Sequence, residues 1–351
     1  MPETMRAIIK PRPGPGLEMA RVPIPKIGPR EVLVKVRATS ICGTDVHIYK
    51  WDAWAQGRIK KMPYTIGHEF CGDVVEVGSA VRSLQVGDFV SADSHRFDGT
   101  CPVCRAGQAH ICANLEIFGV DVDGCFAEYV ALPETSAWVN DPDLDPAIAS
   151  IQDPCGNSVY AVLAEPVAGR SVVVFGDGPT GLFAVGVAKA AGASLVAHVG
   201  KYPARLAIGK TLGATISLNI TEPGTDVVRT LLDATQGVGV DVVVEMTGSQ
   251  TAIDQGFSAL RKGGRVSIFG IPSQPITLDL NKQIIFKGAT IYGINGRQLW
   301  QSWYQMAGMF KSGALDPKPV ITHRITLDEF QHGFDLMTAS DRVAAKIVMY
   351  P

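Results

Sequence analysis

The chain has 351 residues, of which 46% are hydrophobic, and this length is enough for two domains of roughly 100 to 200 residues each. Its 32 basic and 34 acidic residues give a net charge of −2, which argues against a generally basic nucleic-acid-binding protein. The sequence has neither a long uncharged apolar run nor an apolar signal core at its N-terminus, so we expect no membrane span and no secretion. Seven cysteines, an odd number, suggest metal binding in a cytoplasmic enzyme rather than a disulfide framework.

The first 155 residues or so are predicted to form short β-strands joined by turns. Residues 31–38 alternate apolar and polar side chains, as a half-buried strand does. Residues 71–77 and 87–91 are further strand candidates beside turns that contain glycine. This part of the chain therefore predicts a β-rich domain.

From residue 171 onwards, apolar runs alternate with helical patterns. Continuous apolar runs are typical of strands buried on both faces of a parallel sheet. We predict strands at 171–176, 194–199, 215–218, 241–246, 264–270 and 290–294, and helices at 180–191, 203–212, 225–234 and 252–260. Six strands with intervening helices indicate an α/β fold with a doubly wound Rossmann sheet.

The last 55 residues or so contain a helical pattern at 299–311 and a terminal strand at 344–350. They are too few for a separate domain, so we expect them to return to the first one. The predicted organisation is a discontinuous zinc-binding catalytic domain, 1–158 with 298–351, and a dinucleotide-binding domain, 159–297.

A glycine motif follows the first of these buried strands. Gly176, Gly178 and Gly181 fit G-x-G-x-x-G, with Pro179 and Thr180 between the last two glycines. In this context the first glycine allows a tight turn, the second lets a pyrophosphate approach the backbone, and the third lets helix and strand pack closely. We therefore predict that these five residues bind a dinucleotide at the helix N-terminus.

The end of the second buried strand bears on the choice between NAD and NADP. NAD-binding proteins usually carry an Asp or Glu there, which bonds the ribose hydroxyls. This chain has Gly200, followed by Lys201 and Arg205. A small residue and two cations favour a 2′-phosphate, so we predict NADP with NAD as the alternative.

Separate segments of the first domain carry residues suited to a catalytic metal. Cys and His are good zinc ligands, and a catalytic zinc needs few protein ligands and one exchangeable position. The candidates, in chain order, are Cys42, Thr44, His47, His68, Glu69 and Asp153.

This set, placed ahead of a dinucleotide fold, resembles the zinc-dependent medium-chain alcohol dehydrogenase superfamily over nearly the whole chain. Within it, the resemblance is closest to the L-threonine 3-dehydrogenases. It is carried by residues 41–56, 66–70, 117–129, 153–159, 284–306 and 321–325. The resemblance implies a GroES-like β-rich catalytic domain joined to the six-stranded Rossmann domain.

The resemblance also implies roles for individual residues. Cys42 and His68 would bind the catalytic zinc, and Glu69 would be a ligand that alternates with water. Asp153 stands where relatives often have Glu or Cys, so it would either bind zinc directly or hold a zinc-bound water. Thr44 would take the proton of the alcohol, and His47 would pass it towards solvent.

Three more residues are expected near the reactants. His95 matches a histidine placed near the substrate in threonine dehydrogenases, and Arg297 matches an arginine of the cofactor-side loop. Gly248, which follows the strand predicted at 241–246, is also expected to contact the cofactor.

A second group of cysteines indicates a structural zinc. Cys101, Cys104 and Cys112 have C-x2-C-x7-C spacing, and the additional cysteine of the superfamily falls at Asp98. A Cys3Asp zinc site is chemically reasonable, although oxygen is a less usual ligand in structural sites. The alternative is a metal-free lobe with three reduced thiols.

The sequence thus predicts an enzyme that transfers hydride from a small secondary alcohol to a nicotinamide cofactor, resembling L-threonine 3-dehydrogenase. The alternative is a polyol or sugar dehydrogenase of the same superfamily. A non-catalytic relative is disfavoured because the zinc-binding and relay residues occur together, and a zinc-finger role because paired histidines are missing. The resemblance further suggests a homotetramer or homodimer.

Overall fold

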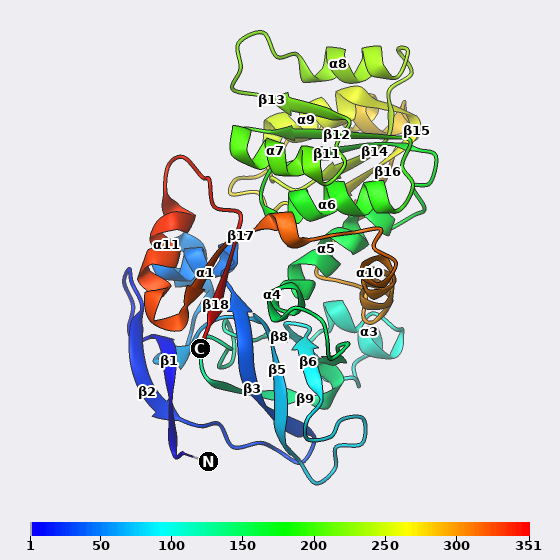
Figure 1. Cartoon of the computed structure of the whole chain (residues 1–351). Coiled ribbons are helices and arrows are strands. Elements are labelled where there is room, and N and C mark those ends of the chain that lie inside the picture. Colours follow the sequence, from blue (N-terminus) through cyan, green and yellow to red (C-terminus); the bar gives the residue numbers. More distant parts are fainter. Residues whose placement is uncertain (1) are drawn as a thin grey trace. The chain divides into compact units, whose positions relative to one another are not determined.

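The computed structural model describes residues 2–351 and divides the chain into two compact units (Figure 1). The first unit comprises Met1–Asp153 and Ile321–Pro351, and the second comprises Pro154–Val320. The chain thus leaves the first unit and returns to it at its C-terminal end.

The strands in the sheets of the first unit pair antiparallel, except for the parallel pair β17 and β18. Its largest sheet has the strand order β10-β6-β5-β3-β18-β17, with β9 also paired to β3, and a smaller one has the order β2-β1-β4. The strands of the large sheet are β3 (Glu31–Ser40), β5 (Glu69–Val77), β6 (Phe89–Ala92), β9 (Tyr129–Pro133), β10 (Ala137–Val139), β17 (Ile321–Thr326) and β18 (Lys346–Tyr350). The others are β1 (Thr4–Lys10), β2 (Glu18–Pro23) and β4 (Tyr64–Thr65), and the separate pair β7 (His95–Arg96) and β8 (Glu116–Ile117).

The C-terminal strand is part of the large sheet of the first unit. In Figure 1, β18, coloured red, lies beside the blue β3, and Val348 pairs with Ser40. Short helices complete the unit: α1 (Gly43–Lys50), α2 (Ala53–Arg58), α3 (Pro102–Arg105), α4 (Pro146–Ser150) and α11 (Phe330–Thr338). Its core contains Phe70, Phe126 and Ile347, which are almost fully buried within one apolar cluster.

The second unit is a six-stranded parallel sheet with helices along it. The strand order is β13-β12-β11-β14-β15-β16, which confirms the doubly wound fold predicted from the sequence. The strands are β11 (Ser171–Phe175), β12 (Leu195–Gly200), β13 (Ile216–Asn219), β14 (Val240–Glu245), β15 (Leu260–Ile268) and β16 (Thr290–Gly293). The helices are α6 (Pro179–Ala190), α7 (Pro203–Thr211), α8 (Val227–Ala234), α9 (Gln250–Ala259) and α10 (Gln301–Lys311).

The segment 298–320 belongs to the second unit, whereas the sequence assigned it to the first. Leu315 packs so closely on α6 that a Cβ at Gly186 would lie 2.6 Å from its Cδ1. Residues 318–320 also contact α6 and α7. These apolar contacts explain why the chain leaves the Rossmann unit only at residue 320. Residues 154–158 also differ from the prediction, which assigned them to the first domain. The boundary between the two units falls after Asp153, inside α5 (Gln152–Leu163), so these residues belong to the second unit.

All seven cysteines are free. Among the helices formed by residues 2–351, none combines the length and apolar character that crossing a membrane requires.

Candidate active site

The pairing of β3 with β5 brings the first group of predicted metal ligands together. Ser40 is paired with Glu69, the first residue of β5, and Cys42 lies two residues beyond Ser40 at the start of α1. The ligand atoms of Cys42, His68 and Glu69 all lie within 4.8 Å of one another. Sequence segments 26 residues apart therefore form one cluster.

Asp45 orients this cluster from the first turn of α1. Its Oδ2 accepts a hydrogen bond of 2.8 Å from the backbone N–H of Cys42, and its Oδ1 lies 3.5 Å from Nδ1 of His68. Burial opposes the charged form of His68, but the charges of Asp45 and Cys42 outweigh it and raise the pKa of His68 well above its ordinary value. The Asp45 carboxylate therefore faces Nδ1 of His68 at ion-pair distance, and the imidazole offers one ring nitrogen to the cluster.

Glu69 is held by one carboxylate oxygen only. Oε2 is contacted by the ammonium of Lys346 and by the hydroxyl of Ser40, and Lys346 also donates 3.1 Å to the carbonyl of Ile41. Oε1 is buried, and no described residue hydrogen-bonds to it. Lys346 was not predicted as a site residue, since an isolated lysine in a terminal strand gives no signal until the fold is known.

The donor set fits zinc. It offers a sulfur, an imidazole nitrogen and a carboxylate oxygen within one small buried volume, and Oε1 of Glu69 lacks a partner that a cation would supply. Asp153 lies outside this group of three. It is buried at the start of α5, where its Oδ1 accepts a hydrogen bond of 2.7 Å from the backbone N–H of Ser94.

The predicted relay residues lie on α1, directly after Cys42. The Thr44 hydroxyl is 3.9 Å from the sulfur of Cys42, and the exposed ring of His47 contacts the carboxylate of Asp52 through Nδ1. His95 is buried on β7, where its backbone N–H donates 3.0 Å to Asp93. It is not one of the three clustered ligands.

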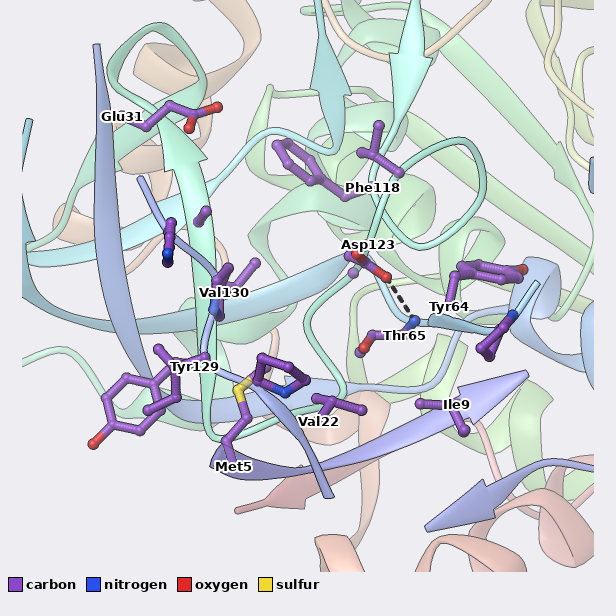
Figure 2. A pocket seen from close by; sticks show the side chains of 18 of the residues that line it. Met5, Ile9, Val22, Glu31, Tyr64, Thr65, Phe118, Asp123, Tyr129 and Val130 are labelled. Atoms are coloured by element: carbon purple, nitrogen blue, oxygen red, sulfur yellow. Dashed lines mark hydrogen bonds between the residues drawn. The ribbon is translucent and has the colours of Figure 1, made fainter. Parts of the chain in front are cut away.

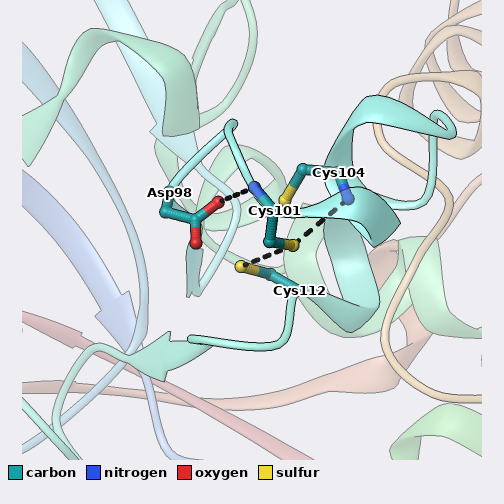
Figure 3. Close-up of side chains that lie close together, drawn as sticks. All are labelled: Asp98, Cys101, Cys104 and Cys112. Atoms are coloured by element: carbon teal, nitrogen blue, oxygen red, sulfur yellow. Dashed lines mark hydrogen bonds between the residues drawn. The ribbon is translucent and has the colours of Figure 1, made fainter.

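Asp98, Cys101, Cys104 and Cys112 form the second cluster, with ligand atoms again within 4.8 Å of one another (Figure 3). The Cys101 and Cys112 sulfurs are 3.9 Å apart. The backbone N–H of Cys104 donates to the Cys101 sulfur and lowers the pKa of that thiol, which favours the thiolate that a metal needs. The Asp98 carboxylate also accepts hydrogen bonds from the N–H groups of residues 100 and 101 and from Asn114.

The glycine motif forms a cradle in front of α6. Gly176 has φ of +119°, which only glycine adopts readily, and a Cβ on Gly181 would lie 2.0 Å from the carbonyl oxygen of Gly176. A Cβ on Gly178, the N-cap, would meet nothing within 4 Å. Backbone N–H groups at a helix N-terminus beside open space fit a pyrophosphate. Pro179 and Thr180 form the first turn, and the carbonyl of Thr180 accepts a bond from Ser158.

The other predicted cofactor residues lie on several elements of the second unit. Gly200 ends β12, Lys201 is exposed beyond it, and Arg205 is buried with its guanidinium 5.6 Å from the ring centre of Tyr202. Gly248, with φ of +68°, lines a cavity of about 400 Å³ after β14. Arg297 is buried and donates a hydrogen bond of 3.0 Å to the Asn157 side chain.

A groove of about 660 Å³ in the first unit contains none of the predicted site residues (Figure 2). It is lined mainly by residues of the segments 22–26, 63–65 and 118–131, with Met5 and Ile9 of β1. At its wall, Asp123 accepts a hydrogen bond from the backbone N–H of Thr65. No motif or residue pattern in the sequence predicts this groove.

Comparison with known proteins identifies both units. Residues 28–142 match the alcohol dehydrogenase GroES-like domain, and residues 179–312 match the zinc-binding dehydrogenase domain. The chain is 47% identical to an L-threonine 3-dehydrogenase of Symbiobacterium thermophilum, over 100% of this chain and 99% of the relative. It is 46% identical to one of Bacillus subtilis, over 99% of each.

A solved structure shows the same fold. A zinc-binding dehydrogenase from Sinorhizobium meliloti, crystallised with NADP, is 31% identical over the whole of both chains and superposes with a TM-score of 0.89. Together with the zinc-type ligand cluster and the dinucleotide cradle, these likenesses decide the class of the protein. The chain belongs to the zinc-dependent alcohol dehydrogenase family, and it is an oxidoreductase that transfers hydride from a CH–OH group to a nicotinamide cofactor.

Proposed function

We propose that the substrate is L-threonine or a closely related amino alcohol, oxidised at its secondary hydroxyl. The Cys42–His68–Glu69 donor cluster carries this proposal, because it lies in a chain 46–47% identical, over nearly its whole length, to proteins named L-threonine 3-dehydrogenase. The polyol or sugar alternative has no comparable support.

In the proposed mechanism, Cys42, His68 and Glu69 would hold a catalytic zinc, and Asp153 would either join them or position a water. Zinc, when bound, makes the hydroxyl of the alcohol more acidic. Thr44, beside the Cys42 sulfur, receives the hydroxyl proton, and the exposed His47 passes it to solvent. Asp52 fixes the ring orientation of His47 through Nδ1.

Further residues orient the reactants in this proposal. His95 faces the substrate, and the Gly176–Gly181 loop, Gly248 and Arg297 hold the cofactor. We propose NADP as the preferred cofactor. β12 ends in a glycine that carries no carboxylate, the adjacent Lys201 is exposed, and a relative was solved with NADP. The burial of Arg205 leaves Lys201 as the accessible cation of the predicted pair.

We also propose a structural zinc at Asp98, Cys101, Cys104 and Cys112, and a homodimer or homotetramer in the cytoplasm. The edge strand β16 supports self-association, because the nearby Ile285 and Phe286 are exposed by 62% and 73% and Ile291 is on the strand itself. Seven free thiols are consistent with a reducing compartment. Sedimentation of the purified protein tests its oligomeric state.

A substrate screen tests the proposed activity. The zinc-loaded enzyme is incubated with NADP or NAD and with L-threonine, L-serine, polyols and simple secondary alcohols, and formation of reduced nicotinamide is followed by absorbance. We expect the highest kcat/KM with L-threonine and NADP. A higher value with a polyol would replace threonine by the alternative, and a higher value with NAD would overturn the proposed cofactor preference.

A further inference from the structure

Asp177, the second residue of the glycine motif, links the phosphate loop to the end of β12. It is 8% exposed, and its Oδ2 accepts hydrogen bonds of 2.7 Å from the backbone N–H of Lys201 and 2.8 Å from that of Tyr202. These two N–H groups precede the first turn of α7, where an anion would otherwise find free donors. The protein's own carboxylate therefore fills this anion site.

The same carboxylate explains why β12 ends in glycine. A Cβ built on Gly200 would lie 2.7 Å from both Cβ and Oδ2 of Asp177. Any side chain at position 200 would collide with Asp177, so one of these two positions can carry a carboxylate, but not both. In this chain the glycine loop supplies the carboxylate that NAD-binding proteins usually carry at the strand end.

Asp177 also has acceptor capacity to spare. Both of its hydrogen bonds within the described chain reach Oδ2, so Oδ1 remains available to a ribose hydroxyl. A 2′-phosphate, with nearly two negative charges, is instead repelled by the carboxylate and finds the Lys201 and Tyr202 N–H groups already occupied. The exposed Lys201 side chain acts in the opposite direction by attracting the phosphate.

We propose that Asp177 is a cofactor-specificity residue, which keeps NAD usable and limits the preference for NADP set by Gly200 and Lys201. This inference rests on the proposed cofactor pocket, and it concerns how strongly the pocket discriminates.

Asp177→Asn tests the proposal because it changes the charge with little change of shape. Both backbone donors reach one oxygen, and the amide oxygen of Asn can take over both bonds. The dissociation constants of NADPH and NADH are measured by fluorescence titration, without any alcohol substrate. We expect the ratio Kd(NADH)/Kd(NADPH) to rise about tenfold, a change equivalent to about 1.4 kcal/mol. An unchanged ratio, including equal weakening of both cofactors, would overturn the proposal and leave Asp177 as a loop anchor only.

Asp233→Asn is the matched control. It removes the same charge from the same unit, but Asp233 is exposed on α8 and paired with Arg229. Its ratio should stay within about twofold of the wild-type value, since exposed charges are largely screened by salt. If Kd(NADH)/Kd(NADPH) also rose tenfold in Asp233→Asn, the effect would come from net charge, and Asp177 would have no specific role.

A second pair of variants keeps the proposal testable if Asp177→Asn does not fold. Gly200→Asp alone places a side chain against Asp177 and should weaken both cofactors. Asp177→Gly with Gly200→Asp removes the Cβ and carboxylate atoms that cause the collision and returns the carboxylate to the strand end, so NADH binding should recover while NADPH binding does not. If the double variant binds NADPH as tightly as the wild type, the proposal fails. Because these comparisons are made between variants by binding, they stand apart from the wild-type substrate and cofactor preference on which the proposed function depends.

Discussion

The ammonium of Lys346 contacts Oε2 of Glu69, and both side chains are almost completely buried. The contact joins the C-terminal strand β18 to the first residue of β5, 277 positions earlier in the sequence. It neutralises one oxygen of a buried carboxylate and leaves the other, Oε1, without a hydrogen-bond partner among the described residues, in a side chain that clusters with Cys42 and His68. Lys346 therefore positions a proposed metal ligand.

Lys346→Met should destabilise the metal-free protein by about 3 to 5 kcal/mol, because it leaves the Glu69 charge buried without its partner. Denaturant unfolding in a chelator measures this loss. The double variant with Glu69→Gln should regain part of the stability, since no charge then remains to be compensated. A loss below about 1 kcal/mol in the single variant would show that Glu69 does not depend on Lys346.

The Rossmann unit was predictable from the sequence because each strand is a continuous apolar run and the glycine motif marks the first turn. Strand boundaries were less predictable. β15 begins at Leu260, four residues before the predicted start, because its pairing with β14 contains a register shift between Val240 and Val242. The extent of this unit also depended on Leu315 and Gly186, whose packing no local pattern reveals.

The candidate site was predictable where residue type and sequence spacing indicate metal ligands. Cys42, His68 and Glu69 come together as expected, as do the three cysteines with Asp98. Lys346 and Asp177 were missed, because their roles arise from pairing across the sheet and from a bond between loop and strand end. Such contacts depend on tertiary structure, which residue type and spacing do not encode locally.

Cys42→Ser and His68→Ala should each abolish turnover while NADPH still binds. The first variant removes the thiolate and the second the imidazole of the proposed zinc site, whereas the cradle at Gly176–Gly181 lies in the other unit. Zinc content, turnover and NADPH fluorescence are measured on the same preparations. Full turnover in a variant that has lost its zinc would contradict the proposed mechanism, and lost cofactor binding would point to a global fold defect.

The second cluster should raise the zinc content to two per chain. Cys104→Ser should remove one zinc and leave the zinc at Cys42 in place, since the two clusters share no residue. Asp98→Ala tests the fourth ligand, and we expect it to lose the same zinc more readily to a chelator. A wild-type content of one zinc, lost with Cys42→Ser, would show that the lobe holds reduced thiols without metal.

His198 makes the stability of the second unit depend on pH. It is buried on β12, with Nε2 3.1 Å from the carbonyl oxygen of Gly176 and with no described partner for Nδ1. A Cβ on Gly209 would lie only 2.2 Å from Nδ1, so a second ring proton would point at the backbone of α7. Burial lowers the pKa of His198 below its ordinary value of 6.5, and it outweighs the opposing effects of Gly176 and Asp177.

Because the folded pKa is the lower one, the unfolded chain binds the proton first as the pH falls. The contribution of neutral His198 to the free energy of unfolding should therefore be complete above about pH 6.5. It should decrease as the pH falls from that value through the folded pKa of His198. His198→Gln keeps a donor for Gly176 without the titration, so its unfolding free energy should decline less over this range. Denaturant unfolding from pH 8 to about pH 5 measures the difference. His332→Gln, which removes an exposed histidine of α11, should follow the wild-type profile, and parallel profiles for all three proteins would rule out His198 as the source.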